Sequence, residues 1–295
     1  MKTAMMTGDI TRFGDIEFAL RLIKELGFEA ADLTMFDVEG FWLRNKELFN
    51  GDIYANARRI KKIAEEINLP IVQAHTPFHV YVKGDEKYNA EMLETQKMCI
   101  EIAGIIGIAH VVIHPVMNAD DEFNKKFFDK LLPLAKKNNV IITTENMWEW
   151  QKGAPHCDYT TCSTPESFLR LLEHINHPNL KACVDVGHAQ MFNSFDQSIS
   201  PKKMIEKLGK KYCVALHLHD NDGVHDLHKV PFEGVINRDE IYEGLVNINY
   251  EENLITETLC PHDYTLEDCK ALWIRQRAAV DTIKAEILRR KALRS

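Results

Sequence analysis

Short apolar runs alternate with amphipathic stretches along the whole sequence, and this alternation is the feature that most constrains the fold. Eight runs predict strands, at residues 3–6, 30–33, 71–74, 111–113, 140–144, 180–184, 213–216 and 254–256. Strands that alternate with helices are typical of parallel α/β proteins. Eight such units fit the length of a (β/α)8 TIM barrel. We therefore expect one TIM-barrel domain over residues 1–295.

The stretches between the runs predict helices. Ile16, Leu20 and Ile23 recur at helical spacing, and Gly27 ends this first helix. Further helices are expected at residues 52–68, 88–106, 124–137 and 266–290, and one helix should begin in the segment Ser163-Thr164-Pro165-Glu166. Residues 34–51 predict a loop.

Side chains that bind metals stand at the ends of six predicted strands. They are His75, His114, Glu145, Asp185, His217 and Glu257. A barrel brings the carboxyl ends of all its strands to one mouth. Taken singly, each histidine is more simply explained as a hydrogen-bonded structural residue, and Glu145 as a cap. Three carboxylates in one mouth repel one another unless a cation compensates, so the set as a whole predicts a divalent metal.

The densest group of such residues lies at residues 216–234, which hold four histidines and three aspartates. His217 and His219 project from the same face of a strand end, and alternation alone does not decide which one is a ligand. Turn formers follow, and they carry Asp226 and His228 on a loop that folds back. The alternative is a polar surface loop whose histidines cluster by chance. His188, three residues after Asp185, reaches the same mouth or orients a ligand.

The donor set Glu145, Asp185, His217 and Glu257 mixes oxygen and nitrogen atoms, which suits Mn, Zn, Co or Mg. Glu145 and Glu257 follow different strands, so we expect them to act as an acid/base pair on a substrate between them. One carboxylate would remove a proton from carbon beside a carbonyl, and the other would return a proton. The result is isomerisation or epimerisation. Trp148 and Trp150 could stack on a sugar face, or they could simply pack on their own scaffold.

The overall composition narrows the class of partner. A formal net charge of -8 disfavours nucleic acid as a partner, since phosphate binding needs a basic surface. No segment approaches the roughly 20 apolar residues that span a bilayer, and the first residues show no apolar signal region, so we expect a cytoplasmic protein without a membrane partner. The seven cysteines lack a repeating spacing, which predicts free thiols.

The strand-end motifs together resemble the xylose-isomerase-like TIM-barrel superfamily, and within it the sugar phosphate isomerase/epimerase group. The motifs are AHTPF at 74–78, VIHP at 112–115, TEN at 144–146, VDVGHA at 184–189, HLHDNDG and DLH within 217–228, and ITE at 255–257. The resemblance implies that the Glu, Asp, His, Glu set binds a divalent cation and that the two glutamates flank the substrate. It also implies that His217 is the ligand and His219 an adjacent wall residue.

The same superfamily includes apurinic endonucleases of the endonuclease IV type, which use further ligands in a trinuclear zinc site. This sequence matches them at His75, His114, His188, Asp226 and His228, so these residues and His219 are expected to bind substrate or a second metal. The chain lacks an obvious basic intercalating loop near the first two strands. It also departs from the family pattern Pro-Gly-x-Gly, because it reads Pro231-Phe232-Glu233-Gly234.

The resulting hypothesis is a metal-dependent isomerase or epimerase of a small sugar, sugar phosphate or related polyol. The first alternative is a metal-dependent dehydratase or lyase on a keto-sugar or inosose, because an enediolate also eliminates water. The second is an endonuclease IV-like phosphodiesterase on abasic DNA. A non-enzymatic sugar-binding protein would lack the acid/base pair. Apolar residues in the long C-terminal helix are compatible with a homo-oligomer.

Overall fold

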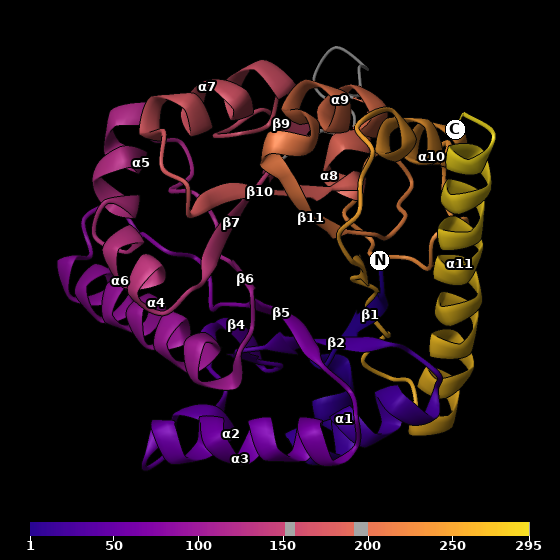
Figure 1. The fold of residues 1–295 in the computed structure, drawn as a ribbon. Coiled ribbons are helices and arrows are strands. Elements are labelled where there is room, and N and C mark those ends of the chain that lie inside the picture. Colours follow the sequence, from indigo (N-terminus) through magenta and orange to yellow (C-terminus); the bar gives the residue numbers. More distant parts are fainter. Residues whose placement is uncertain (151–156, 192–199, 295) are drawn as a thin grey trace. The chain divides into compact units, whose positions relative to one another are not determined.

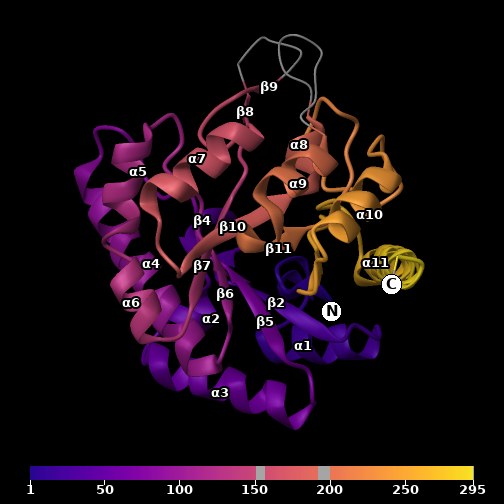
Figure 2. The ribbon, with the colours of Figure 1, turned by 45° about the horizontal axis from the view of Figure 1, so that its top comes forward.

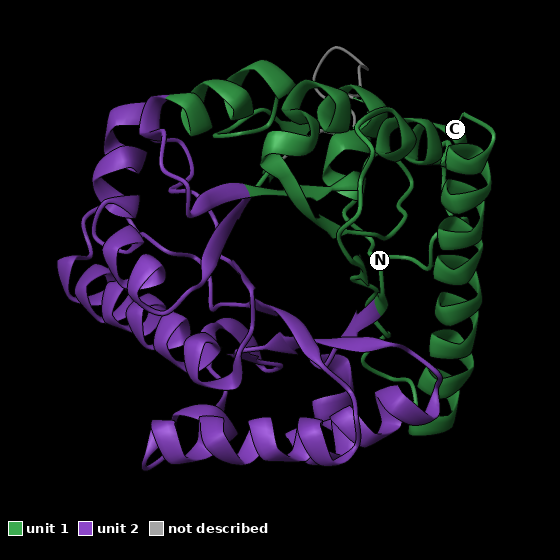
Figure 3. Cartoon of the chain, viewed as in Figure 1, with its two compact units in different colours: residues 1–3, 145–173, 182–295 green, residues 4–144, 174–181 purple. Residues whose placement is uncertain are grey.

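The computed structural model describes residues 1–150, 157–191 and 200–294. The chain divides into two compact units (Figure 3). Unit 1 consists of residues 1–3, 145–173 and 182–295, and unit 2 consists of residues 4–144 and 174–181.

Unit 2 is built on parallel strands that pair in chain order. These are β1 (Thr3–Met6), β2 (Ala30–Thr34), β5 (Ile71–His75), β6 (His110–Val112) and β7 (Ile141–Glu145). Helices α1 (Ile16–Glu25) and α3 (Ile53–Glu66) lie on the outer side of β2 and β5 in both ribbon views (Figures 1 and 2). Side chains along the strands are almost all buried, as expected for strands that are covered on both faces.

The remaining elements of unit 2 complete the crossovers between its strands. They are η1 (Asp9–Arg12), β3 (Phe36–Asp37), β4 (Gly40–Arg44), α2 (Lys46–Phe49), α4 (Glu86–Ile106), α5 (Asp121–Phe128) and α6 (Leu132–Lys137). Asp15, Asp52, Asp85 and Asp120 each cap a helix N-terminus with a side-chain oxygen, which satisfies backbone donors that the helix leaves open.

Unit 1 contains the later strands and the hairpin that follows β7. Strand β10 (Leu180–Asp185) pairs in parallel with β11 (Cys213–His217), and Leu218 bridges to Thr256 in β12 (Leu254–Thr256). The hairpin pairs β8 (Glu149–Trp150) with β9 (Cys157–Asp158). Its helices are α7 (Pro165–Ile175), α8 (Val186–Gln190), α9 (Pro201–Tyr212), α10 (Arg238–Asn247) and α11 (Leu266–Ala292). Helix α10 packs against both α9 and α11 (Figure 2).

Each of the eight predicted strands is present, and each end agrees with the prediction to within one residue. The prediction of one helix at 124–137 was wrong, because two helices, α5 and α6, occupy this segment. Pro133 explains the break, since proline has no N–H to donate and fits only the first turn of a helix. The expected loop at 34–51 instead holds the β3–β4 hairpin and α2.

Within the described residues, no helix combines the length and the apolar character that a membrane span requires. All seven cysteines are buried free thiols.

Candidate metal centre and active site

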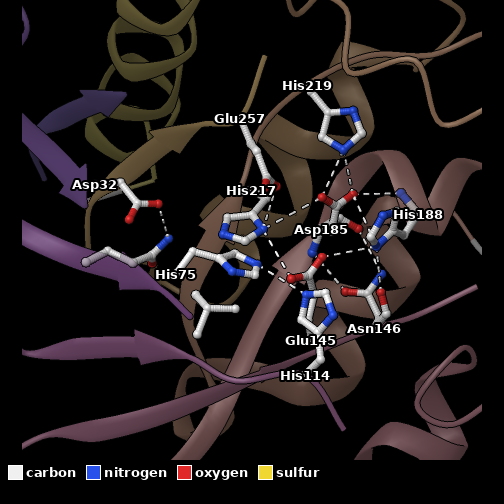
Figure 4. A network of polar contacts seen from close by, with 12 residues as sticks. Asp32, His75, His114, Glu145, Asn146, Asp185, His188, His217, His219 and Glu257 are labelled. Carbon is white, nitrogen blue, oxygen red and sulfur yellow. Dashed lines mark hydrogen bonds and ion pairs between the residues drawn. The ribbon is translucent and has the colours of Figure 1, made fainter. Parts of the chain in front are cut away.

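Four side chains at strand ends of unit 1 converge and are called here the strand-end cluster (Figure 4). Glu145 ends β7, Asp185 ends β10, His217 ends β11, and Glu257 directly follows β12. Each residue offers one ligand atom, and these atoms lie within 4.8 Å of one another. The cluster forms because the carboxyl ends of parallel strands present their last side chains at the same edge.

His217 is the centre of the strand-end cluster. Its Nδ1 lies 2.8 Å from Glu257 Oε2, 3.3 Å from Glu145 Oε2 and 3.9 Å from Asp185 Oδ2. Ligands about 2.0–2.2 Å from a shared ion lie about 3–4 Å from one another, so these spacings suit one divalent cation. Glu257 is the most open of the four, with 13% of its side chain exposed. The cluster is therefore most accessible at Glu257.

The charges of the strand-end cluster do not balance by themselves. Burial lowers the pKa of His217, but Cys183, Glu257 and Glu145 hold that pKa well above its ordinary value. Burial raises the pKa of Glu257, but His217 has the opposite and larger effect. The pKa of Glu257 is therefore lowered to about 2. Three carboxylates thus share one imidazole in a buried place, and oxygen-rich mixed donors of this kind fit a divalent cation.

Asn146 fixes the position of Asp185. Its Oδ1 accepts a hydrogen bond from the backbone N–H of Asp185 at 2.8 Å, and its Nδ2 donates to the Asp185 carbonyl at 2.9 Å. The carboxylate of Asp185 also caps α8, because Oδ1 accepts the His188 N–H at 2.7 Å. Sequence reasoning assigned no role to Asn146, although it stands inside the TEN motif.

A second group, the loop cluster, lies beside these ligands. Its members are His188, His219, Asp226 and His228, whose ligand atoms also lie within 4.8 Å of one another. Asp226 Oδ2 is 3.0 Å from His228 Nε2 and 3.3 Å from His188 Nε2. Burial raises the pKa of Asp226, but the two histidines lower it well below its usual range. In return, Asp226 overcomes the effect of burial on His228 and raises its pKa to about 10.

Two histidines link the loop cluster to the strand-end cluster. His188 Nδ1 lies 3.1 Å from Glu145 Oε1 and 2.8 Å from the Asn146 carbonyl. His219 Nε2 lies 2.9 Å from both carboxylate oxygens of Asp185 (Figure 4). The loop cluster is therefore placed to orient two of the three carboxylates of the strand-end cluster.

Gly187 provides the space that His219 occupies. A Cβ at this position would lie 2.0 Å from His219 Cε1, closer than side chains ever pack. On its other side, the His219 ring stacks on His228 with 3.9 Å between ring centroids. His228 has a backbone φ of 44°, and its Nδ1 donates to the Glu257 carbonyl at 2.8 Å, which directs Nε2 toward Asp226.

A family model described as xylose isomerase-like TIM barrel matches residues 20–279. The chain belongs to the xylose isomerase-like TIM-barrel family. Its fold is therefore the (β/α)8 barrel that the alternation of strands and helices predicted. The match covers segments of both units, and a single domain over residues 1–295 stays a prediction.

This xylose isomerase-like protein is similar to several sugar epimerases in sequence or in structure. Fructoselysine 3-epimerase of Shigella flexneri is 25% identical over 264 residues, which cover 85% of this chain and 87% of that protein. A D-tagatose 3-epimerase-like protein has a similar structure, with a TM-score of 0.73 at 20% identity over 97% of this chain and 100% of that chain. The structure of L-ribulose 3-epimerase is also similar, with a TM-score of 0.72 at 15% identity. This likeness covers 100% of this chain and 98% of that chain. The two structural likenesses bear on the fold.

His75 and His114 belong to unit 2 of this xylose isomerase-like protein. Both are buried where β5 and β6 end, and their Nε2 atoms lie 3.2 Å apart. The His75 Nδ1 faces the Thr76 carbonyl at 2.9 Å, which leaves Nε2 for His114. The structure thus brings these two predicted residues together as a pair.

The two tryptophans after β7 differ in what the structure describes. The Trp148 ring packs edge-on near His188, with 6.3 Å between ring centroids. The backbone of Trp150 lies in β8, and its side chain lies outside the described part of the chain. The predicted stacking of a sugar on Trp148 and Trp150 stays a prediction.

The loop that departs from the family pattern wraps around Asp220. The Asp220 carboxylate accepts hydrogen bonds from the backbone N–H groups of Phe232, at 3.0 Å, and Ile236, at 3.1 Å. Gly234 is required here, because a Cβ would lie 2.2 Å from the Asn221 carbonyl oxygen. Phe232 replaces the first glycine of the pattern, yet it keeps a φ of 80°, which favours glycine. The loop thus retains the backbone that glycine would adopt and adds an aromatic side chain.

Proposed function

We propose that the chain is a divalent-metal-dependent isomerase or epimerase of a small sugar, sugar phosphate or related polyol. The observation that carries this proposal is the convergence of Glu145 and Glu257 with Asp185 and His217 in one buried cluster. A relative of 25% identity named fructoselysine 3-epimerase supports a sugar as the substrate. The 13% exposure of the Glu257 side chain supports access of a small molecule to the cluster.

The two glutamates have the roles of base and acid in this proposal. One carboxylate removes the proton from the carbon beside the substrate carbonyl, and the other returns a proton to give the isomer or epimer. His188 Nδ1 lies 3.1 Å from one oxygen of Glu145, and His217 Nδ1 lies 3.3 Å from the other, so an imidazole faces each oxygen. Glu257 has the more open side chain, which suits exchange of a proton with substrate.

Glu145, Asp185, His217 and Glu257 would hold the cation, which is Mn, Zn, Co or Mg. When bound, the cation withdraws electrons from the carbonyl and adjacent hydroxyl, which acidifies the C–H bond. Asn146 and His219 keep Asp185 in place for this purpose.

The remaining histidines would bind the substrate hydroxyl groups or a second metal. They are His75, His114, His188, His219 and His228, with Asp226 as the acidic member. The raised pKa of His228, to about 10 through Asp226 against the effect of burial, favours a protonated donor to a substrate oxygen. A cytoplasmic location and a homo-oligomeric state stay predictions from the sequence.

Proton exchange in heavy water tests the proposed reaction. Protein loaded with Mn²⁺ is incubated with ketoses, aldoses, sugar phosphates and inososes, and deuterium incorporation is followed by NMR. We expect one substrate class to gain deuterium at carbon and to yield an isomer or epimer. The control is the same protein after chelation, which should show no exchange. Absence of exchange on every sugar by the loaded protein would contradict the proposal.

Two alternatives have specific signs in the same experiment. Loss of water from a keto-sugar or inosose would identify a dehydratase or lyase. The loop cluster favours the endonuclease IV-like alternative, because its four ligand atoms are also close enough to share an ion. Scission of abasic-site DNA by the metal-loaded protein, without exchange on sugars, would identify that activity.

A further inference from the structure

A buried cysteine lies beside the strand-end cluster. Across residues 1–150, 157–191 and 200–294, Cys183 is the one cysteine that stands in a group of potential metal ligands. Its sulfur, one oxygen of Glu145 and one nitrogen of His217 lie within 4.8 Å of one another. All three residues are buried and belong to unit 1, and they are called here the thiol set. The proposed function uses Glu145 and His217 but gives Cys183 no role.

The geometry of β10 directs Cys183 toward these ligands. Side chains alternate along a strand, so Cys183 lies on the same face of β10 as Asp185 of the strand-end cluster. In the pairing of β10 with β11, Cys183 lies opposite Ala215, two residues before His217. The Cys183 thiol forms a hydrogen bond with the His217 ring. The sulfur therefore lies on the face of the strand that carries the ligands.

Glu145 and His217 belong to two different sets of ligands. In the strand-end cluster they combine with oxygens of Asp185 and Glu257, which makes an oxygen-rich set. In the thiol set they combine with a sulfur. Carboxylate oxygens suit Mn²⁺ and Mg²⁺, whereas cysteine sulfur selects thiophilic ions such as Zn²⁺ and Cd²⁺. The two sets therefore favour different classes of ion.

The shared histidine allows only one ion at a time. A neutral imidazole has one lone pair for a metal, because its other ring nitrogen carries a proton. The second shared residue meets the histidine at the same place, since His217 Nδ1 lies 3.3 Å from Glu145 Oε2 (Figure 4). An ion that is held by the thiol set therefore excludes an ion from the strand-end cluster.

We propose that Cys183, Glu145 and His217 form an alternative site for a thiophilic divalent ion, of the class of Cd²⁺ and Zn²⁺, which competes with the ion of the strand-end cluster. This inference rests on the proposed function and extends it to inhibition, because the competing ion also occupies Glu145, one of the two proposed acid/base groups. Three protein ligands leave one position of a tetrahedral ion open.

Binding at the thiol set exchanges one bond of the sulfur for another. Burial raises the pKa of the Cys183 thiol to about 12, so the sulfur carries a proton before the ion arrives. A thiol that coordinates a divalent ion loses this proton outright. The bond between Sγ and the ion forms as the S–H bond breaks, the proton goes to water, and neither partner is oxidised or reduced.

Displacement of Mn²⁺ by Cd²⁺ tests the thiol set. The full chain is loaded with Mn²⁺, Cd²⁺ is added, and free Mn²⁺ is followed by its EPR signal. We expect Cd²⁺ to release Mn²⁺ from the wild type and to give an ultraviolet charge-transfer band from sulfur. In Cys183→Ser, the release should need at least about tenfold more Cd²⁺. Cys213→Ser is the matched control and should behave as the wild type, because Cys213 is equally buried and belongs to no such group among the described residues.

Glu257→Gln is the reciprocal variant. It removes an oxygen ligand from the strand-end cluster and leaves the thiol set intact. The preference for Cd²⁺ over Mn²⁺ should therefore rise in Glu257→Gln and fall in Cys183→Ser. A fall in both variants would show that both ions use the strand-end cluster, which would overturn the alternative site.

The other outcomes separate this site from the proposed function. Release of Mn²⁺ at the same Cd²⁺ concentration in the wild type and in Cys183→Ser would overturn the thiol set, as would Cd²⁺ that binds without release of Mn²⁺. If Cys183→Ser does not fold, cadmium NMR of the wild type decides: a competing Cd²⁺ with only oxygen and nitrogen ligands would overturn the thiol set. Each of these results leaves the proposed function standing if the Mn²⁺-loaded protein exchanges sugar protons. A wild type that binds neither ion would overturn both.

Discussion

The strand-end cluster and the loop cluster use the same kinds of side chain in opposite proportions. The strand-end cluster has three carboxylates around one imidazole, whereas the loop cluster has three imidazoles around one carboxylate. Protons taken up by histidine balance the loop cluster, as the pKa of His228, raised to about 10 by Asp226 against burial, indicates. The strand-end cluster has only one imidazole of its own for three carboxylates, and this mixed donor set suits a divalent cation.

The two clusters also differ in how the chain holds them. Residues of the strand-end cluster stand at or beside the ends of paired strands, whose register fixes each side chain. The loop cluster depends on contacts between side chains, such as the stack of His219 on His228. Two of its histidines contact Glu145 and Asp185 of the strand-end cluster. We infer that the strand-end cluster does the chemistry and that the loop cluster positions it.

Substitution of the glutamates has the largest expected effect. Glu145→Gln and Glu257→Gln should each lower kcat for proton exchange about 10³-fold or more, because a general base and a ligand oxygen are lost together. His228→Asn, in the loop cluster, should lower kcat only about tenfold, the cost of losing an outer partner. Steady-state kinetics on the substrate found by exchange measure both. Equal losses in Glu257→Gln and His228→Asn would break the distinction between the clusters.

Gly187→Ala tests the contact that joins the clusters. The added Cβ would overlap the His219 ring and push it away from Asp185, at a cost of about 3 kcal/mol in the free energy of unfolding. In a His219→Ala background the same change should cost less than about 1 kcal/mol, because the overlap is gone. Urea unfolding of the four proteins measures this coupling. A cost that is the same in both backgrounds would show that Gly187 does not serve His219.

His110 shows how burial acts on a histidine that belongs to neither cluster, which sharpens the contrast with the loop cluster. Burial in β6 lowers its pKa to about 4, from an unfolded value near 6.5. The unfolded chain then binds the extra proton, so the free energy of unfolding falls as the pH drops from about 6.5 towards about 4. Between pH 7.5 and 4.5, the free energy of unfolding of His110→Phe should fall by about 2–3 kcal/mol less than that of the wild type. Urea unfolding at the two pH values measures this difference. An equal loss in both proteins would contradict this assignment.

The sequence predicts the strands and the ligands at their ends for a physical reason. Strands are short apolar runs, and a side chain that follows such a run lies at the mouth, so local pattern alone predicted that Glu145 and Asp185 converge there. Alternation could not separate His217 from His219, because both do point into the site. Only the structure shows that His217 Nδ1 lies nearest Glu257, at 2.8 Å, and that His219 contacts Asp185.

Features that depend on contacts between distant segments could not be read from the sequence. The Asn146 contact joins residues 39 positions apart, and the space beside Gly187 exists only once His219 packs there. The β3–β4 hairpin was missed because its strands are very short and one of them exposes most of its side chains, which hides the usual pattern.

Metal binding tests the central claim most directly. Native mass spectrometry after equilibration with Mn²⁺ counts ions per chain in the wild type, in Glu257→Gln of the strand-end cluster and in Asp226→Asn of the loop cluster. We predict that the most tightly bound ion of the wild type is lost in Glu257→Gln and kept in Asp226→Asn. An ion that remains in Glu257→Gln and disappears in Asp226→Asn would place the metal in the loop cluster and contradict the account.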